Sequence, residues 1–422
     1  MLDGHQHHQA QGGGGFGYRQ IDRDDRCTAS RYRTMGVAAV LLTGLAVWAI
    51  GVASGVDRNG RYAGRPIPDG PNGRVLVFSD EFDALDTYKW QHEVTLGGGG
   101  NWEFQLYSNN RSNSYTRDGI LYLRPTLTAD MIGEANVRSG YTMDLWGNEP
   151  GNLCTGNAFY GCQRTSGAGG NYLNPIMSAR LRSSRSFHFK YGRVEVRAKL
   201  PRGDWIWPAI WFLPQWSAYG QWPASGEIDM IESRGNADYP PGLGVDTAAT
   251  TLHWGPWAAE DQWPKTHGSY TLPKGTYADD FHLFVMEWSE SRLTTYVDTP
   301  DNIMLDVHWN KTGHWEFGGW DDDPRMKNPW EGRGSNAPFD QEFFMIMNVA
   351  VGGTNTYFED GVGGKPWVNS DQHSVNKFWD AKDQWLPTWD GEDAAMKVDY
   401  VRIYQAKEHI KVTKYHPAVE FV

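Results

Sequence analysis

The six residues from Glu227 to Glu232 constrain the fold of this chain more than any other segment. They read Glu, Ile, Asp, Met, Ile, Glu, so apolar residues separate three carboxylates. On a regular strand, Glu227 and Asp229 share one face and Glu232 lies on the other. One extra residue, inserted as a β-bulge, brings Glu232 beside the other two. A solvated acidic strand is the alternative, but Ile and Met favour a strand with one covered face.

Two Glu carboxyl groups on one face of such a strand lie about two residue steps apart. That spacing is close to the ~5–5.5 Å between the nucleophile and the acid/base of a retaining glycosidase. The segment therefore predicts a pair of carboxylates arranged for glycoside cleavage.

Further motifs follow one another along the chain. They are Tyr191–Pro201, Trp207–Pro214, Thr251–Gly255, Asn348–Gly353 and Val398–Tyr404. Together with Glu227–Glu232, this ordered set closely resembles glycoside hydrolase family 16. The likeness is to its endo-1,3-β-glucanase (laminarinase-like) branch and to the related animal β-1,3-glucan recognition proteins. It extends from Val75 to Gln405.

Strand patterns recur through the body of the chain. Alternation is clear in Val194–Leu200 and Val398–Tyr404, and Phe343–Val351 is a near-continuous apolar run. Such patterns, without long helical periodicity, predict an all-β fold of two packed antiparallel sheets. The resemblance implies a β-jelly-roll sandwich whose concave sheet forms the substrate groove.

The N-terminal region predicts a membrane segment ahead of the β domain. Residues 1–34 carry little that could form a core and are expected to be disordered. Residues 35–56 carry no charge and suit a transmembrane helix that acts as a signal anchor, with cleavage as a secretory leader as the alternative. A Gly- and Pro-rich stem follows at 57–74, then the family 16 domain at 75–405. The C-terminal tail, 406–422, has no readable role.

Two features that follow the predicted membrane segment in the sequence indicate that the β domain lies in an oxidising compartment. Cys154 and Cys162 flank a short segment rich in turn formers and would close a small loop as a disulfide, with two unrelated thiols as the alternative. Asn110 and Asn310 begin Asn-x-Ser/Thr glycosylation triplets. We therefore expect a single-pass (type II) membrane protein with an extracellular or lumenal catalytic domain. Secretion is the alternative.

Charge and aromatic content narrow the class of partner. The net charge of −12, without a long basic stretch, argues against nucleic acid. The chain has 21 Trp and 20 Tyr, and flat rings suit the apolar C–H faces of sugars, although packing between sheets also uses such rings. We expect β-1,3-glucan polysaccharide as the partner and a monomeric catalytic domain.

The resemblance assigns catalytic roles to the three carboxylates. Glu227 matches the nucleophile, which attacks the anomeric carbon, and Glu232 matches the acid/base. Asp229, between them, is expected to orient Glu227. Glu232 must hold a proton near neutral pH, and the charge of Glu227 and burial beneath bound sugar both raise its pKa. Catalysis by this pair requires no cofactor.

Several other residues are expected to bind substrate, mainly because of the resemblance. They are Trp207, Trp211, His253, Trp254, Asn101, Asn348 and Arg180. Trp207 is expected to be a sugar platform near the point of cleavage, and His253 a hydrogen-bond partner beside the nucleophile. A structural role in the core is the alternative for Trp207 and Trp211, for His253 and for Asn348.

The resemblance also implies a structural Ca²⁺ site on the convex side of the sandwich. Glu81, Gly119 and Asp399 match the family's acidic residue near the first strand, its backbone carbonyl and its last-strand Asp. Oxygen ligands of this mix suit Ca²⁺. Ordinary acids at a sheet edge are the alternative. The metal would stabilise the domain and take no part in catalysis.

Two classes of function remain open. One is a retaining endo-hydrolase of laminarin-like β-1,3-glucan. The other is a β-1,3-glucan recognition protein of innate immunity that keeps the groove but does not cut. The presence of both Glu227 and Glu232 favours the enzyme, because nothing else supplies either role. Other family branches share the bulged signature and act on other β-glycans, so the glucan assignment depends on the flanking motifs.

Overall fold

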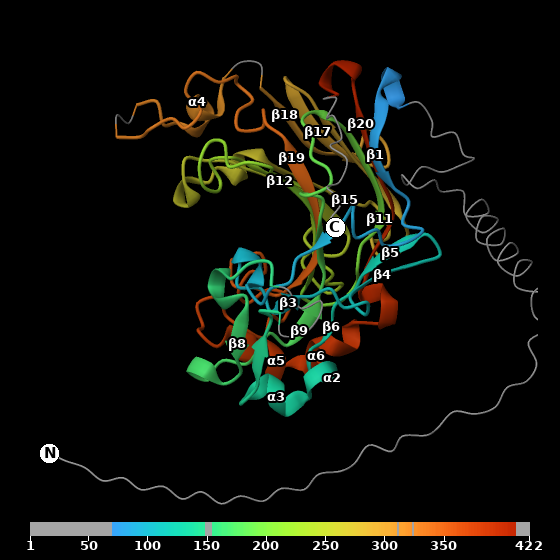
Figure 1. The fold of residues 1–422 in the computed structure, drawn as a ribbon, viewed down its shortest axis with the longest axis vertical. Helices are drawn as coiled ribbons and strands as arrows, with labels where there is room; N and C mark the ends of the chain where they lie inside the picture. Colours follow the sequence, from blue (N-terminus) through green and yellow to red (C-terminus); the bar gives the residue numbers. More distant parts are fainter. Residues whose placement is uncertain (1–69, 148–153, 310–311, 323–324, 411–422) are drawn as a thin grey trace, which may run out of the picture. The chain divides into compact units, whose positions relative to one another are not determined.

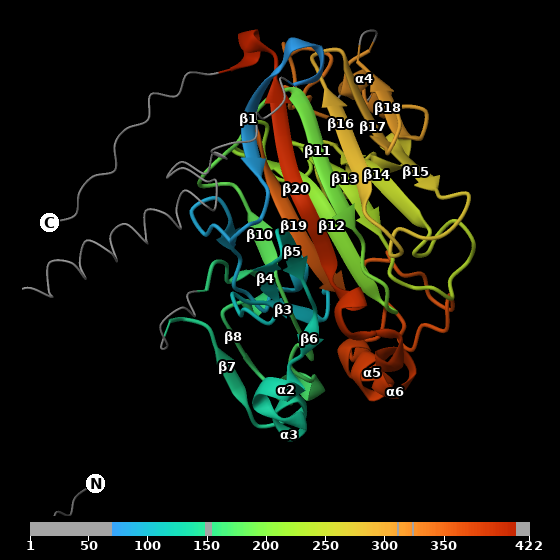
Figure 2. The same cartoon turned by 90° about the vertical axis from the view of Figure 1, so that its right-hand side faces the viewer.

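The computed structural model describes residues 70–147, 154–309, 312–322 and 325–410. Within this part of the chain, two antiparallel β-sheets pack face to face (Figure 1, Figure 2). The predicted all-β sandwich is therefore confirmed.

The first sheet has the strand order β18-β17-β16-β11-β20-β5-β4, and β1 also pairs with β20. Its strands are β18 (Ile303–His308), β17 (Arg292–Val297), β16 (His282–Trp288), β11 (Gly192–Lys199), β20 (Met396–Gln405), β5 (Ile120–Leu123), β4 (Ser114–Arg117) and β1 (Val75–Asp80). The first and last strands of the domain lie side by side, because Val75 pairs with Gln405. In β11, Val194 and Val196 are fully buried whereas Arg197 faces outward, as the alternation predicts.

The second sheet has the order β15-β14-β13-β12-β19-β10-β2. Its strands are β15 (His267–Thr271), β14 (Thr247–His253), β13 (Glu227–Ser233), β12 (Ile206–Pro214), β19 (Phe343–Val351), β10 (Arg180–Arg182) and β2 (Gln91–His92). The apolar run of β19 is buried over almost its whole length because strands flank it on both sides and core side chains cover it. The main core contains side chains from both sheets, such as Val196, Ile228 and Met347.

Short elements gather at one end of the sandwich, at the bottom of Figures 1 and 2. They are β3 (Gln105–Tyr107), β6 (Thr126–Leu127), β9 (Ile176–Ser178), β7 (Thr142–Asp144), β8 (Gln163–Thr165), α2 (Ala129–Ile132), α3 (Glu134–Arg138), α5 (Ser374–Asp380) and α6 (Lys382–Trp385). A further helix, α4 (His314–Gly318), follows β18. Trp205, Trp367 and Trp385 are almost completely buried in a second core at this end. Much of the aromatic surplus therefore serves packing.

Some predictions concern regions outside the description. The proposed anchor at 35–56 and Asn310 both lie there. Within the described residues, no helix combines the length and apolar character needed to cross a membrane. Asn110 is exposed, as a glycosylation acceptor requires. Cys154 and Cys162 form the predicted disulfide, with their Cα atoms 5.4 Å apart.

Candidate active site

The predicted bulge lies in β13. Ile210 of β12 pairs with Ile231 of β13. The next residue, Trp211, pairs with Asp229, so Met230 is left without a partner on β12. This extra residue changes the parity of the strand, and all three β13 carboxylates line one groove while its Ile and Met side chains are fully buried. The strand register confirms the bulge.

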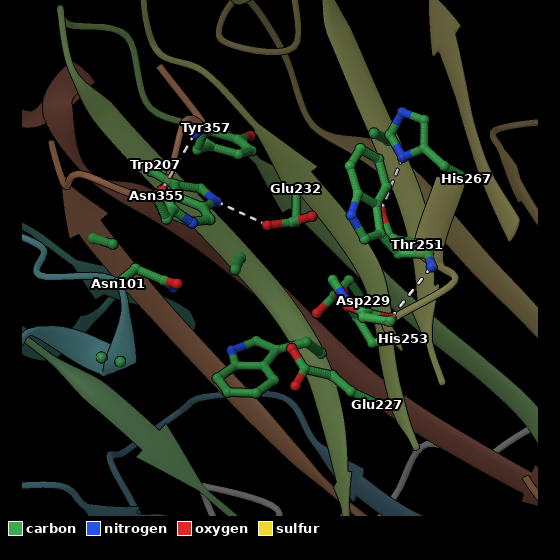
Figure 3. A pocket seen from close by; sticks show the side chains of 18 of the residues that line it. Asn101, Trp207, Glu227, Asp229, Glu232, Thr251, His253, His267, Asn355 and Tyr357 are labelled. Atoms are coloured by element: carbon green, nitrogen blue, oxygen red, sulfur yellow. Dashed lines mark hydrogen bonds and ion pairs between the residues drawn. The ribbon is translucent and has the colours of Figure 1, made fainter. Parts of the chain in front are cut away.

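The groove is an open cavity of about 1220 Å³. Its lining comes from β10, β12, β13, β14, β15 and β19 of the second sheet and from neighbouring loops. Figure 3 shows Glu227, Asp229 and Glu232 along one wall. All but one of the residues predicted to bind substrate line the groove, namely Trp207, Trp211, His253, Asn101, Asn348 and Arg180.

A tryptophan orients each of the two glutamates. Trp207 Nε1 donates a hydrogen bond to Glu232 Oε1 at 2.9 Å. Trp222 Nε1 donates one to Glu227 Oε2 at 2.7 Å. Trp222 lies in the loop between β12 and β13, where no strand pattern points to it. Because both indoles donate, they stabilise the ionised form of each carboxyl group.

One face of Trp207 is covered by Tyr357. The two rings stack at 3.8 Å between centroids and 5° between planes (Figure 3). The guanidinium of Arg234 lies 4.1 Å from the Tyr357 ring centroid and donates to the Tyr357 carbonyl. Trp207 is only 7% exposed and packs in the second core, so it offers little surface to a sugar. Tyr357 lies in a loop after β19. This loop has no periodic sequence pattern from which the position of Tyr357 in the groove could be predicted.

His253 lies between two carboxylates. Its Nε2 is 3.2 Å from Asp229 Oδ2, and its Nδ1 is 2.5 Å from Asp261 Oδ2. Asp261 also accepts hydrogen bonds from the backbone N–H groups of Trp254 and Trp263. Burial lowers the pKa of His253, but the contacts with Asp229 and Asp261 outweigh it and raise the pKa well above its usual value. The two carboxylates therefore favour the protonated form of His253, whose charge offsets part of the negative charge of the groove.

Burial raises the pKa of all three β13 carboxyl groups. Burial and the nearby Asp229 outweigh His253 and raise the pKa of Glu227 from 4.5 to about 8. Burial and Glu232 raise the pKa of Asp229 from 3.8 to about 6. The pKa of Glu232 is raised by burial and, to a smaller extent, by Glu227. The groove therefore retains at least one proton at neutral pH. The rise in the pKa of Glu232 was predicted from the sequence, but the rise in the pKa of Glu227 was not.

A buried polar network lies at the floor of the groove. Trp211 Nε1 donates to Asn348 Oδ1 at 2.7 Å, and Asn348 Nδ2 donates to Tyr107 Oη at 3.1 Å. The Arg180 guanidinium lies 4.9 Å from the centroids of both the Trp211 and Tyr107 rings. Arg180 and Asn348 are almost fully buried, so they hold Trp211 in place and expose little surface to a ligand.

The network continues to Glu103, which sequence analysis missed. Tyr107 Oη donates to Glu103 Oε2 at 3.2 Å, and Asn101 Nδ2 donates to Glu103 Oε1 at 3.1 Å. Glu103 is buried, and burial raises its pKa against the opposing charge of Arg180. Its place in the Asn101–Tyr107 segment was visible in the sequence, but its inward orientation was not.

Trp254 lies outside the groove, contrary to the prediction that it contacts substrate. Its ring is completely buried, and Nε1 donates to Thr266 Oγ1 at 2.8 Å. It packs against Phe317 and Trp320 in the main core. Trp254 directly follows His253 at the end of β14, and adjacent residues of an extended chain point to opposite sides. His253 therefore faces the groove and Trp254 faces the core.

We expect Trp254→Ala to destabilise the domain by roughly 3–5 kcal/mol, because the change leaves a large cavity. Urea-induced unfolding followed by far-UV circular dichroism measures this loss. The matched control is Trp216→Ala, since Trp216 is 68% exposed and lies outside the groove lining. The control should leave the midpoint of unfolding almost unchanged. Equal losses in both variants would contradict the structural assignment of Trp254.

The three residues of the predicted calcium site come together at one end of the first sheet. Asp80 pairs with Val401 and Leu121 with Val398, which brings the neighbouring Glu81, Gly119 and Asp399 close. Both carboxylates bond to arginines, Glu81 to Arg402 and Asp399 to Arg197. Ca²⁺ would therefore have to compete with these arginines for both carboxylates. The calcium site stays a prediction.

The sequence and fold have clear relatives. Residues 162–312 match the model of glycosyl hydrolases family 16. A β-1,3-glucan-binding protein of Penaeus monodon is 51% identical over 337 residues, which are 78% of this chain and 90% of the relative. The glucan endo-1,3-beta-glucosidase A1 of Niallia circulans is 32% identical over 364 residues, 83% of this chain but only 40% of that enzyme.

A solved structure of a non-specific endo-β-1,3(4)-glucanase from family 16 shares the fold. Its TM-score is 0.50 at 22% identity, over 81% of this chain and 98% of that one. This likeness extends the jelly-roll architecture to the described domain. The motifs, the bulged β13 and the relative with 51% identity agree on one assignment. The chain belongs to glycoside hydrolase family 16.

Proposed function

We propose that this chain binds β-1,3-glucan in the groove over the second sheet. The similarity to the Penaeus monodon β-1,3-glucan-binding protein supports this ligand. The groove suits a neutral polysaccharide, since the exposed indole rings of Trp222 and Trp263 line it, as does the polar side chain of Asn101. Isothermal titration of the full chain with soluble laminarin tests the proposal. Saturable heat is expected, and its absence would contradict glucan binding.

A second candidate function is cleavage of the bound glucan. The observation that favours it is the position of Glu227 and Glu232 on one groove wall, each held by an indole N–H. Recognition without cleavage has the stronger support from the named relatives, so the two functions need a direct test. Release of reducing ends from laminarin over time distinguishes them. A chain that binds laminarin without releasing reducing ends is a recognition protein.

Cleavage would follow the double displacement of a retaining glycosidase. A Glu227 oxygen would attack the anomeric carbon as the glycosidic C–O bond breaks and Glu232 gives its proton to the leaving oxygen. Glu232 would then take a proton from water, which attacks the same carbon and releases Glu227 from the glycosyl ester. Asp229 and the cationic His253 would balance charge beside Glu227.

We expect hydrolysis to show a bell-shaped pH profile with its maximum between about pH 6 and pH 8, the values to which the pKa of Asp229 and that of Glu227 are raised. The three carboxyl groups share their protons as one set, and hydrolysis requires the form in which Glu232 holds the proton and Glu227 is ionised. Below this range the set takes up a further proton, and Glu227 is no longer ionised in that form. Above it, the last proton leaves and no acid remains for the leaving oxygen. The measurement is kcat/KM for laminarin as a function of pH.

Asp229→Asn provides the control for this profile. The charge of Asp229 raises the pKa of Glu227, so its removal should move the alkaline limb to lower pH. An alkaline limb that does not move would show that the limb reports a different group.

We further propose that the domain works outside the cytosol. The Cys154–Cys162 disulfide and the exposed Asn110 support this location, since such bonds persist in oxidising compartments. The test expresses the protein in secreting cells and compares its electrophoretic mobility before and after enzymatic deglycosylation. A mobility shift is expected for the parent. If the Asn110→Gln variant shows no shift, Asn110 is the glycosylated residue.

A further inference from the structure

Three exposed aromatic residues lie beside the segment 99–101, which lines the groove. Gly99, Gly100 and Asn101 line the groove, and Trp102 directly follows them. Trp102 is 51% exposed, and its ring lies edge-on to that of Phe159, with 5.2 Å between centroids. Phe159 is 45% exposed and the adjacent Tyr160 is 76% exposed. Large apolar rings rarely gather in solvent without a ligand. We call Trp102, Phe159 and Tyr160 the aromatic rim.

The backbone of the aromatic rim is unusual for such bulky residues. Trp102 has φ of +52°, Phe159 +54° and Tyr160 +59°, all in the left-handed region. Bulky side chains are outliers there, because Cβ approaches the following carbonyl. The neighbouring Gly99 has φ of +58° without this cost. Three aromatic residues thus occupy positions where glycine would favour folding, which points to a role for their rings.

The loop that carries Phe159 and Tyr160 is fixed to the groove edge. The disulfide closes it at Cys154 and Cys162. The Leu96 N–H donates to the Gly161 carbonyl at 2.7 Å, and Arg164 donates to the Phe159 carbonyl at 2.6 Å. The rings are therefore presented by a well-braced loop, which lowers the entropy cost of binding a ligand.

The charge around the aromatic rim fits a neutral ligand. Neither the segment 95–102 nor the loop 154–162 contains an Asp, Glu, Lys or Arg residue. An anionic or cationic partner would find no opposite charge in these two segments. Sugar rings of a neutral glycan, by contrast, place apolar C–H faces against aromatic rings and need no charge.

We propose that the aromatic rim binds sugar units of the same glucan chain that occupies the groove, beyond the units next to the carboxylates. This inference rests on the proposed glucan binding. Because Trp102 directly follows Asn101, a glucan chain that leaves the groove past Asn101 would reach Trp102 (Figure 3 shows Asn101 among the side chains that line the groove). The aromatic rim then makes affinity depend on chain length and favours polymers over short oligosaccharides.

The test measures affinity against chain length. The full chain carrying Glu227→Gln, to prevent cleavage, is titrated with laminaritriose, laminariheptaose and soluble laminarin. Trp102→Ala and Phe159→Ala are each expected to weaken binding of the two longer ligands up to about tenfold, as loss of one aromatic contact predicts. Binding of laminaritriose should not change. Tyr88→Ala, which removes a 94% exposed ring far from the groove lining, is the matched control and should bind all three ligands normally.

A second variant separates binding from folding. Trp102→Gly relieves the left-handed strain, so its melting temperature should be equal to or above that of the parent while long-chain affinity still falls. Trp102→Tyr should retain the affinity, since it keeps a ring. If the parent binds no laminarin, the proposed function fails. If the parent binds but Trp102→Gly and Phe159→Ala bind long chains equally well, or lose affinity equally for laminaritriose, the aromatic rim is overturned as a distal site.

Discussion

Glu227→Gln is expected to reduce laminarin hydrolysis to background while leaving laminarin affinity and the melting temperature close to those of the parent. Gln has nearly the same shape but cannot form the glycosyl ester. The amide still meets Trp222 Nε1 through its carbonyl oxygen, so the local hydrogen bond survives. Initial rates of reducing-end release, with affinity by titration on the same preparations, measure the two effects separately.

Glu232→Gln should affect hydrolysis differently from Glu227→Gln, because Glu232 supplies the proton to the leaving oxygen. The rate on laminarin is expected to fall by about 10²–10⁴, the usual contribution of general acid–base catalysis. An aryl glycoside whose leaving group is an acidic phenol needs little protonation. Formation of the glycosyl-enzyme from this substrate should therefore be almost unaffected in Glu232→Gln. Glu290→Gln, an exposed acid in the turn between β16 and β17, is the matched control and should retain full activity. Inverted products, or normal turnover in Glu227→Gln, would refute the double displacement.

Insertion of one alanine between Met230 and Ile231 is expected to destabilise the domain by about 4 kcal/mol or more, the upper end for a change at one position. With a second extra residue in β13, the faces of the residues that follow it are reversed. Ile231 would then face the groove, and the Glu232 carboxyl would face the core between the sheets, where an unpaired charge is very costly. The midpoint of urea unfolding and the near-UV circular dichroism spectrum measure the loss.

Met230→Leu is the comparison for this insertion. Met230 is completely buried, and Leu has a similar volume, so the cost should stay below about 1.5 kcal/mol. The bulge and the carboxylate positions should be unchanged. An insertion variant that folds as stably as the parent and still cleaves or binds laminarin would show that the parity of β13 does not place Glu232.

Several parts of the candidate site were predictable because they depend on consecutive residues. Side-chain alternation and the spacing of Glu227, Asp229 and Glu232 required a bulge in a covered strand, and the register contains it at Met230. The same parity could have separated His253 from Trp254, which are adjacent and face opposite sides. The prediction that both contact substrate failed because it followed the motif and not the alternation.

The sequence by itself determined the strand pattern, the sandwich, the disulfide and the carboxylates on β13, because short-range spacing and face alternation encode them. Only the tertiary structure decided which distant groups meet those carboxylates. Asp261 reaches His253, Trp222 reaches Glu227, and Tyr357 covers Trp207 from loops that carry no periodic pattern. These contacts depend on where loops come to lie over the curved sheet. They set the burial and neighbouring charges that raise the pKa of Glu227, which no local spacing could reveal.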